Sequence, residues 1–394
     1  MERKDVYLAS KPRYEILDGL RGVAAFIVMC FHLLEASSTD HDHMLTDYIG
    51  HGYLAVDFFF ILSGFVIGYA YDDRWNRMTT WGFIKRRIIR LHPTIVFAII
   101  LGLALFYYGW GDMFPLVQQA DVWSLLLISV MFFFMIPVPV GMDIKGWQET
   151  TPLNGNAWSL WFEYVANLLY ALVIRHFPKW LLAVFVALCA VLTLDIALDI
   201  DMFGFLAERN SHYTIHGGWS LNAEQMYLGF SRLLFPFFAG LLMSKMSLSI
   251  KTSRGFWWCS LFLAIALFVP RIATNGTLTI GNGIYEAAAV LLIFPVIVAM
   301  GAGSTVTGRS SKICKFFGEI SYPLYLVHQP IVFTLYGTWR ASHLEATFGQ
   351  LMVVCLGMMF LSVFISYAFL KLMDEPVREW LKGKLFDKPI KVEK

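Results

Sequence analysis

The stretch ILDGLRGVAAFIVMCFHLLE, residues 16–35, is apolar and long enough to cross a membrane, yet it contains Asp18, Arg21, His32 and Glu35. An ionisable side chain in a membrane helix is costly, so by default it faces the protein interior or a water-filled cavity and marks a functional site. Arg21 and His32 are eleven residues apart and return to nearly the same helix face. The stretch therefore predicts a membrane helix with a functional polar stripe. The alternative is that both side chains only anchor the helix at the membrane interfaces.

The composition is that of an integral membrane protein. Hydrophobic residues make up 57% of the 394 residues and charged residues only 15%, whereas soluble domains are about one quarter charged. The mean hydropathy is +0.59. The net charge of +2 is too small to indicate a nucleic-acid partner. Five cysteines lack the spacing of a disulfide framework or a metal site, so we expect neither: Cys30, Cys189, Cys259, Cys314 and Cys355.

Eleven apolar segments are candidates for membrane spans. They cover residues 15–35, 52–71, 93–110, 122–140, 157–175, 180–199, 225–244, 256–270, 284–301, 319–337 and 350–373. Short basic loops favour the cytoplasm, and all of them can lie there only if one of the two segments between residues 93 and 140 does not cross. We assign that role to 122–140, as a re-entrant or surface piece, because Pro137 and Pro139 break helices.

The predicted fold is an all-α integral membrane bundle of about ten transmembrane helices with both termini cytoplasmic. It forms a single domain over residues 1–394, in which residues 374–394 are a cytoplasmic tail. A rival arrangement keeps eleven spans and leaves one basic loop outside.

Two carboxylates lie at about the depth of His32. Asp57 falls in GYLAVDFFFILSGFVIGY at residues 52–69, and Glu163 falls in NAWSLWFEYVANLLY at residues 156–170. Either carboxylate could orient the His32 imidazole, which would suit proton transfer. A structural ion pair of Asp57 with Arg21 or Arg232 is the alternative.

Cationic residues gather in WGFIKRRIIRLHPTIVF at residues 81–97. Arg86, Arg87 and Arg90 share a broad helix face there. Because Arg makes bidentate contacts to phosphate oxygens, the face indicates a cytoplasmic phosphate site. The alternative is an anchor on anionic lipid headgroups.

Polar residues also follow one face of a later span. Tyr325 and His328 share it in GEISYPLYLVHQPI at residues 318–331, while Arg232 in GFSRLLFPFFAG at residues 229–240 supplies a deep cation. Functional roles are expected for His328 and Arg232. The alternatives are an interface aromatic for Tyr325 and structural roles for the other two.

Five motifs in this order resemble the acyltransferase-3 family of integral-membrane O-acyltransferases. The matches are Arg21 and His32 with ten residues between them, Val56 to Phe65, Arg87 to Pro93, Trp158 to Glu163, and Ser321 to His328. Each motif alone is degenerate, but the resemblance runs from LDGLRGVAAFIVMCFH to EPVREW, over nearly the whole chain.

The resemblance implies ten spans and transfer of an acyl group, usually acetyl from acetyl-CoA, to a hydroxyl of a carbohydrate at or across the bacterial inner membrane. It also implies that Arg21 and His32 are essential and that Arg87 and Arg90 belong to the family's arginine loop. Many relatives append a periplasmic esterase-like domain. Because this sequence ends twenty-odd residues after its last span, we expect the membrane domain alone.

The chemistry of such a transfer assigns roles to the polar residues. A thioester is already activated, so the enzyme must deprotonate a hydroxyl, hold it against the carbonyl and stabilise the oxyanion. We expect His32 to be the base, with Asp57 or Glu163 orienting it and Tyr325 or His328 near the oxyanion. Transient acetylation of His32, with His328 as the base, is the alternative.

The cationic residues are assigned to the donor. Arg86, Arg87 and Arg90 would hold the CoA phosphates at the cytoplasmic face, and Arg232 is also placed on the donor side. Arg21 lies about 16 Å below His32 along the helix, so it belongs to the donor channel. The expected partners are acyl-CoA, a carbohydrate or lipid-linked carbohydrate, and membrane lipids.

Two other classes of protein remain as alternatives. A transporter of a sugar or small solute also uses polar stripes in a multi-span bundle, although no pair of matching broken helices is found in two halves. A regulatory or scaffolding membrane protein leaves the inward Arg, Asp, Glu and His residues unexplained.

Overall fold

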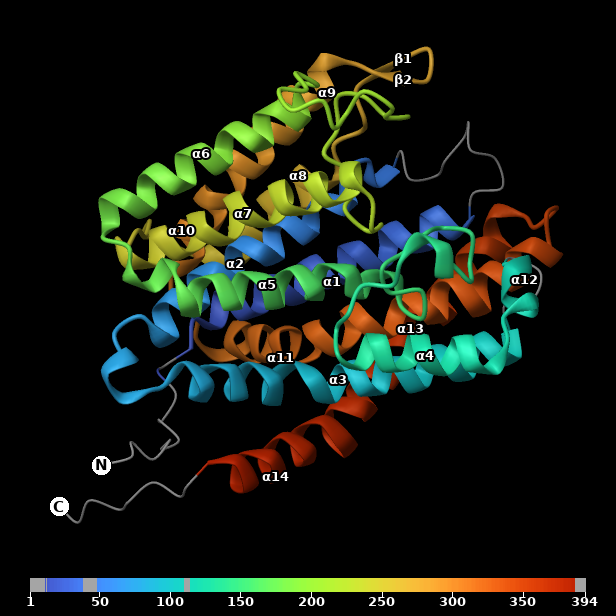
Figure 1. Cartoon of the computed structure of the whole chain (residues 1–394), viewed down its shortest axis with the longest axis horizontal. Helices are drawn as coiled ribbons and strands as arrows, with labels where there is room; N and C mark the ends of the chain where they lie inside the picture. The colour runs from blue at the N-terminus through green and yellow to red at the C-terminus, as the bar shows by residue number, and fades with distance from the viewer. Residues whose placement is uncertain (1–10, 12, 38–47, 110–113, 387–394) are drawn as a thin grey trace.

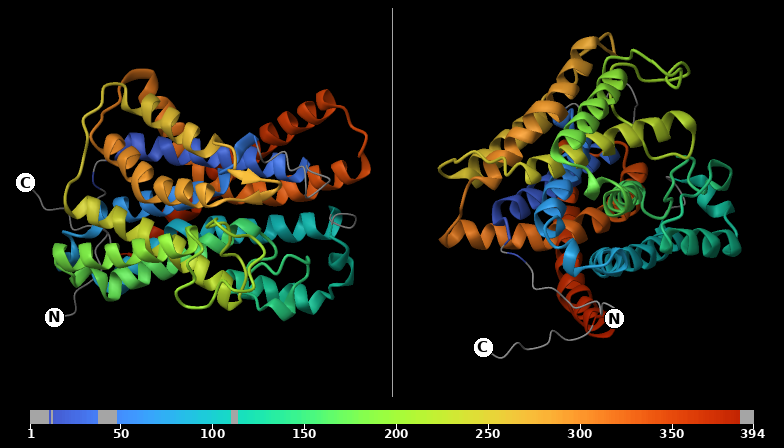
Figure 2. Two further views of the ribbon diagram at one scale, coloured as in Figure 1. Left: turned by 90° about the horizontal axis from the view of Figure 1, so that it is seen from above. Right: turned by 60° about the vertical axis from the view of Figure 1, so that its left-hand side comes forward.

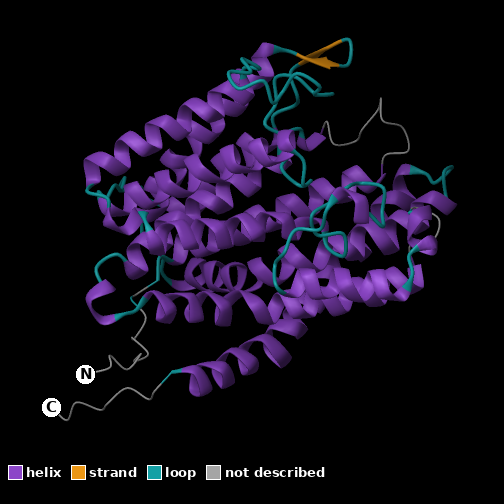
Figure 3. Cartoon of the chain, in the orientation of Figure 1, coloured by secondary structure: helices purple, strands orange, loops and turns teal. Residues whose placement is uncertain are grey.

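The computed structural model describes residues 11, 13–37, 48–109 and 114–386. These residues form a bundle of helices joined by loops, and the one sheet among them is the hairpin of β1 (Ala273–Thr274) and β2 (Thr277–Leu278) (Figures 1 and 3). The predicted all-α membrane fold is therefore confirmed.

Fourteen α-helices lie in the described residues. They are α1 (Glu15–Ser37), α2 (Ala55–Tyr71), α3 (Thr80–Gly109), α4 (Val122–Phe133), α5 (Trp158–Leu172), α6 (Lys179–Ala197), α7 (Ala223–Lys245), α8 (Gly255–Phe268), α9 (Ile280–Ala288), α10 (Phe294–Ala302), α11 (Gly308–Pro330), α12 (Gly337–Ser342), α13 (Phe348–Phe369) and α14 (Glu375–Leu385). Short π-helical turns join α9 to α10, α11 to α12 and α13 to α14. Two 3₁₀ turns lead into helices that carry residues discussed below: η2 (Gly52–Leu54) precedes α2, and η6 (Gly155–Ala157) precedes α5.

Seven helical stretches in the described residues are long and apolar enough to span a membrane. They are Glu15–Ser37, Gly52–Tyr71, Thr80–Leu105, Lys179–Ala197, Ala223–Lys245, Ile280–Ala302 and Phe348–Leu385. The third begins at Thr80 rather than at residue 93, because the basic run before Pro93 continues the same helix. Helix α4 has only 12 residues, fewer than the roughly 20 that a span needs. Its re-entrant placement, the count of ten and the cytoplasmic termini stay predictions.

Apolar side chains that face outward mark the lipid-facing surface. On α13, Val353, Leu356, Phe360 and Phe364 recur every three or four residues, and each is at least 58% exposed. Such a stripe would be unfavourable in water and is suited to lipid. The charged side chains of Asp57, Arg87 and Arg232 are, by contrast, buried within the bundle.

The two ends of the bundle differ in character. At one end, here called the basic end, Lys11 pairs with Asp73 after α2, and Arg86 near the start of α3 stacks on Phe386 after α14. At the other, the loop end, the segment 198–222 and the β1–β2 hairpin gather around α9 (Figures 1 and 2). Helix α1 begins at the basic end and runs toward the loop end.

Helices α2 and α7 are held in close contact by glycines. A side chain at Gly64 would meet the backbone carbonyl of Phe237, and one at Gly240 would meet that of Ile61. Small residues let membrane helices approach in this way. The two backbones therefore touch directly along this interface.

The same two helices share a buried ion pair. The Arg232 Nη2 atom on α7 lies 2.7 Å from Asp57 Oδ2 on α2. The guanidinium also donates to the carbonyl oxygens of Gly217 and Tyr53, each at 2.8 Å. Both side chains are almost fully inaccessible, so each charge depends on the other for compensation.

We expect Gly64→Val to destabilise the protein because the added methyl groups cannot fit against the Phe237 carbonyl. Overpacking of this kind costs roughly 1–3 kcal/mol. The free energy of unfolding of purified protein in detergent measures the loss. The matched control is Gly357→Val on α13, where nothing lies within 4 Å of an added Cβ atom. Equal losses for the two variants would show that α2 and α7 are not in close contact.

We expect Asp57→Ala to lower the free energy of unfolding by about 3–5 kcal/mol, because it leaves the buried Arg232 charge uncompensated. Glu379→Ala removes an acid from an exposed pair with Lys382 and should cost less than about 1 kcal/mol. Replacing Asp57 and Arg232 together by leucine should recover most of the loss. A double variant as unstable as Asp57→Ala would contradict this account.

Candidate active site

His32 lies toward the loop end of α1, with a polar partner at each ring nitrogen. Its Nδ1 atom is 2.8 Å from Glu35 Oε2, one helical turn further along α1. Its Nε2 atom is 3.1 Å from Asn156 Oδ1 in the turn before α5. The carboxylate accepts a hydrogen bond from Nδ1, which makes Nε2 the nitrogen available for chemistry.

Asn156 connects His32 to His328 on α11. Its Nδ2 atom donates to the Tyr325 carbonyl oxygen at 2.9 Å and lies 3.2 Å from His328 Nε2. Because the carbonyl can only accept, the amide nitrogen faces α11 and the amide oxygen faces His32. The His32 and His328 rings stack with their centroids 5.4 Å apart. His328 Nδ1 donates to the Leu324 carbonyl oxygen at 2.7 Å, so its Nε2 accepts from Asn156.

The turn that carries Asn156 is fixed by buried hydrogen bonds to α11. The Tyr325 hydroxyl donates to the Asn156 carbonyl oxygen at 3.2 Å and lies 2.9 Å from Ser159 Oγ. Asn154 Nδ2 donates to the Leu326 carbonyl oxygen at 2.7 Å. The Tyr325 hydroxyl, which was expected near the oxyanion, therefore positions this turn.

The loop before this turn covers the same site. Trp147 packs edge-on against Phe333, which in turn contacts the His32 ring. Lys145 Nζ lies 2.5 Å from Glu149 Oε2 in the same loop. Burial raises the pKa of Glu149, and the Lys145 ammonium opposes that shift. The loop is thus tied down by its own buried ion pair.

The carboxylates expected to orient His32 are paired elsewhere. Asp57 is held by Arg232, and Glu163 Oε1 lies 2.6 Å from Arg87 Nη2. Neither has a hydrogen bond to His32 among the described residues, whereas Glu35 does. A similar depth in the membrane was not enough to predict which carboxylate contacts His32, because the rotation of each helix about its axis decides which side chains meet.

Four arginines, which we call the arginine cluster, gather nearer the basic end. They are Arg21, Arg87, Arg90 and Arg378. The charges that act on Arg21 include Asp18, Arg90, Glu163 and Arg87, and those that act on Arg378 include Arg90. The cluster joins α1, α3 and α14, which are far apart in the sequence.

The arginine cluster has hydrogen-bonding capacity that the protein does not use. Arg87 is 7% exposed, and its buried Nε atom has no partner in the described residues. Arg90 is exposed and forms no hydrogen bond or ion pair within the described part of the chain. Asp18, Glu163 and Asp374 pair with the other three arginines. Unused donors and an unpaired cation fit an anionic group such as phosphate.

Two expected donor residues make other contacts. Arg86 Nη1 donates to the Gly82 carbonyl oxygen at 2.8 Å, and its guanidinium stacks on Phe386. All three guanidinium nitrogens of Arg232 bond to Asp57 or to backbone carbonyls near the loop end. We therefore leave Arg232 out of the donor site proposed below.

Three residues of the site were not assigned from the sequence. Glu35 follows His32 by three residues, a spacing at which side chains on one helix meet. Asn156 begins the polar stripe that includes Glu163. Arg378 lies in the EPVREW motif. No group of His, Cys, Asp or Glu side chains within the described ranges is arranged to hold a metal ion.

The amino-acid sequence is similar to those of several known proteins. A family model described as an acyltransferase domain matches residues 14–370. "Protein 2 in picA locus" of Rhizobium radiobacter is 33% identical over 169 residues, which cover 40% of this chain and 81% of that protein. "Acyltransferase MdmB" of Streptomyces mycarofaciens is 24% identical over 332 residues, or 81% of this chain and 79% of that protein. No solved structure matches.

A third relative is longer than this chain. "O-acetyltransferase OatA" of Staphylococcus aureus is 25% identical over 345 residues, which cover 84% of this chain and 53% of that protein. The chain thus spans about half the length of that relative. The family model extends from before α1 to the end of α13 and includes both the His32 site and most of the arginine cluster. The chain belongs to the acyltransferase-3 family of multi-pass membrane O-acyltransferases.

Proposed function

We propose that the protein transfers an acyl group, typically acetyl, from cytoplasmic acyl-CoA to a hydroxyl of a carbohydrate acceptor at a bacterial inner membrane. The acceptor would be a surface polysaccharide, an exopolysaccharide or a lipid-linked precursor. The observation that carries this proposal is that His32, which contacts Glu35 and Asn156, lies on the same helix as Arg21 of the arginine cluster. The relatives named as acyltransferases support it.

His32 acts as the general base in this proposal. Its Nε2 atom takes the proton of the acceptor hydroxyl while the oxygen attacks the thioester carbonyl. The tetrahedral intermediate then collapses, the carbon–sulfur bond breaks, and His32 returns the proton to the leaving thiolate. Glu35 keeps Nδ1 protonated and stabilises the imidazolium that forms.

Asn156 favours the transition state over the resting state. Its amide oxygen faces His32 Nε2 and its orientation is fixed by Tyr325. That oxygen can accept a hydrogen bond from Nε2 only when this nitrogen carries a proton. The interaction therefore forms as the hydroxyl proton is transferred, which is the kind of contact that accelerates a reaction.

Oxyanion stabilisation by Tyr325 or His328 requires an exchange of hydrogen bonds. The Tyr325 hydroxyl bonds to Ser159 and to the Asn156 backbone, and both His328 nitrogens have partners. Movement of the turn that carries Asn156 would free them. We therefore assign the two residues primarily to positioning Asn156.

The donor enters from the basic end. Arg87, Arg90 and Arg378 would hold the CoA phosphates, and Arg86 would contribute at the margin of the site. Arg21, also in the arginine cluster, lies about 16 Å short of His32 along α1. The long pantetheine arm would run along this helix and bring the thioester to His32.

We expect His32→Ala to lower kcat by about 10²–10⁴-fold, because it removes the general base. Glu35→Gln should lower kcat with a smaller change in KM, because the neutral amide stabilises the imidazolium less. CoA release by purified protein with acetyl-CoA and acceptor measures both. The matched control is Glu345→Gln at an exposed position.

A different result would assign His32 another role. Trapping acetylated His32 in a single turnover by acid quench, with decay at the rate of product formation, would replace direct transfer by the acetyl-enzyme route. Full activity of Glu35→Gln would remove Glu35 from the mechanism.

We expect Arg90→Gln to raise the KM for acetyl-CoA about tenfold or more, since hydrogen bonds to charged groups contribute roughly 1.5–3 kcal/mol. The KM for S-acetylpantetheine, which lacks the nucleotide phosphates, should not change. Lys312→Gln is the control, because Lys312 is exposed on α11 near the basic end. Equal effects of Arg90→Gln on the two donors would show that Arg90 does not contact the phosphates.

A further inference from the structure

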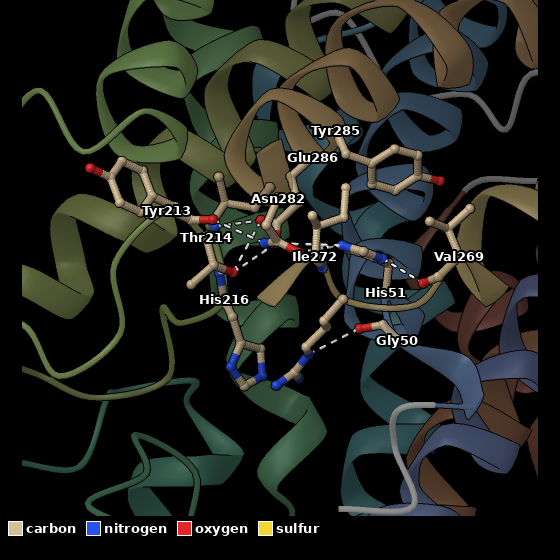
Figure 4. Close-up of polar contacts among 12 residues, drawn as sticks. Gly50, His51, Tyr213, Thr214, His216, Val269, Ile272, Asn282, Tyr285 and Glu286 are labelled. Carbon is tan, nitrogen blue, oxygen red and sulfur yellow. Dashed lines mark hydrogen bonds and ion pairs between the residues drawn. The ribbon is translucent and has the colours of Figure 1, made fainter. Parts of the chain in front are cut away.

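A buried polar network at the loop end fixes the residues around Tyr53. Glu286 of α9 is fully inaccessible and accepts hydrogen bonds from Thr214 Oγ1 at 2.9 Å, Ile215 N at 2.6 Å and Asn282 Nδ2 at 2.6 Å. The Tyr53 hydroxyl donates to the same carboxylate. Figure 4 shows Glu286 within this network while the His216 ring points away from it.

Four side chains form a surface next to this network, which we call the Arg271 surface. Tyr53 is only 6% exposed and lies at its core, with the His216 ring centroid 4.5 Å away and the Arg271 guanidinium 5.4 Å from its ring. Trp219 packs against His216 with centroids 4.9 Å apart. Three aromatic rings and one cation therefore adjoin one another.

The Arg271 surface adjoins the His32 site. Phe31 contacts the His32 ring at 5.4 Å and the Tyr53 ring at 6.2 Å between centroids. A protonated His32 would also act electrostatically on His216. A group bound at Arg271 would thus belong to a molecule that can also reach His32.

Arg271 retains donors that the protein does not use. Its Nε atom donates to the Gly50 carbonyl oxygen at 3.1 Å, and no carboxylate pairs with it in the described residues. Glu286 is occupied by its four hydrogen-bond donors. Arg209 and Arg232, by contrast, pair with Glu224 and Asp57.

Cations lie near the His216 ring. Burial lowers the pKa of His216 well below its ordinary value, and the charges of Arg271, Arg232 and Arg209 lower it further, as a protonated His32 would. His216 is therefore neutral at neutral pH. It adds a hydrogen-bonding group to the surface without opposing an anion.

We propose that the Arg271 surface binds the acceptor through an anionic group, a carboxylate or a phosphate carried by the sugar. This inference rests on the proposed function and specifies its acceptor class. The guanidinium makes a forked contact to such a group, and the half-buried Trp219 ring offers an amphipathic face for the sugar. The hydroxyl to be acylated would then lie toward His32.

Binding of matched glycosides to the purified full chain tests this. The probes are p-nitrophenyl β-D-glucoside, the glucuronide and the glucoside 6-phosphate, which differ only at the sixth carbon. Saturation-transfer NMR in neutral detergent should show at least tenfold tighter binding of one or both anionic probes. The better anionic probe identifies the group. Arg271→Gln should reduce the preference to about one, Arg271→Lys should retain part of it, and Lys312→Gln should keep it.

Equal binding of the three probes, or no binding of any, would overturn the proposal. So would a preference that Arg271→Gln retains, or one that disappears when phosphatidylglycerol is added, since the latter would make Arg271 a lipid-headgroup anchor. The preference should persist in His32→Ala. A variant that loses CoA release but keeps the preference for an anionic probe therefore concerns the catalytic mechanism. A variant that keeps CoA release but loses this preference concerns the acceptor class.

Discussion

The structure depends on the compensation of charges buried within an apolar bundle, and the pair of Asp57 and Arg232 is its central case. The pair joins α2 to α7 where glycines bring the two backbones into contact. The same guanidinium holds the carbonyl oxygens of Tyr53 and Gly217. This one interaction therefore contributes both to helix packing and to the position of the loop-end residues near His32, and an uncompensated charge here would cost several kcal/mol.

In the proposed mechanism, helix α1 separates the two halves of the chemistry. Arg21 lies in the arginine cluster, where phosphate would bind, and His32 lies three turns further along, where the hydroxyl would be deprotonated. The helix is held against α11, which supplies His328 and Tyr325 to the second half. Because a rigid helix fixes this separation, donor recognition and proton transfer can occur at different depths without a change in the fold.

Much of the fold was predictable from sequence, and less of the site. Hydropathy located α1, α2, α5, α7 and α11, but it did not predict α14, which carries Arg378. The spacing of Arg21 and His32 indicated a functional role for α1, which stays a prediction. The partners of Asp57 and Glu163 were harder to assign, since depth along a helix says nothing about its rotation. Ion pairing of Asp57 with Arg232 was one of the alternatives considered. Asn156 lies in a 3₁₀ turn and contacts His32 from there, and α14 brings Arg378 close to α3. Helical periodicity in the sequence could reveal neither contact.

Charges that are fully paired and charges that retain unused donors occupy different places in the protein. Asp57 with Arg232 and Lys145 with Glu149 are closed pairs that hold helices and loops. Arg90 at the basic end and Arg271 at the loop end have no carboxylate partner in the described residues. The half-buried Arg271 would gain from an external anion because the dielectric near a protein interior is lower than in water. The exposed Arg90 would gain through the forked contact that a guanidinium makes to phosphate oxygens. In the proposed mechanism, Arg90 at the basic end would receive the anionic donor and Arg271 at the loop end the anionic acceptor, so the two unpaired cations would bind at opposite ends of the bundle.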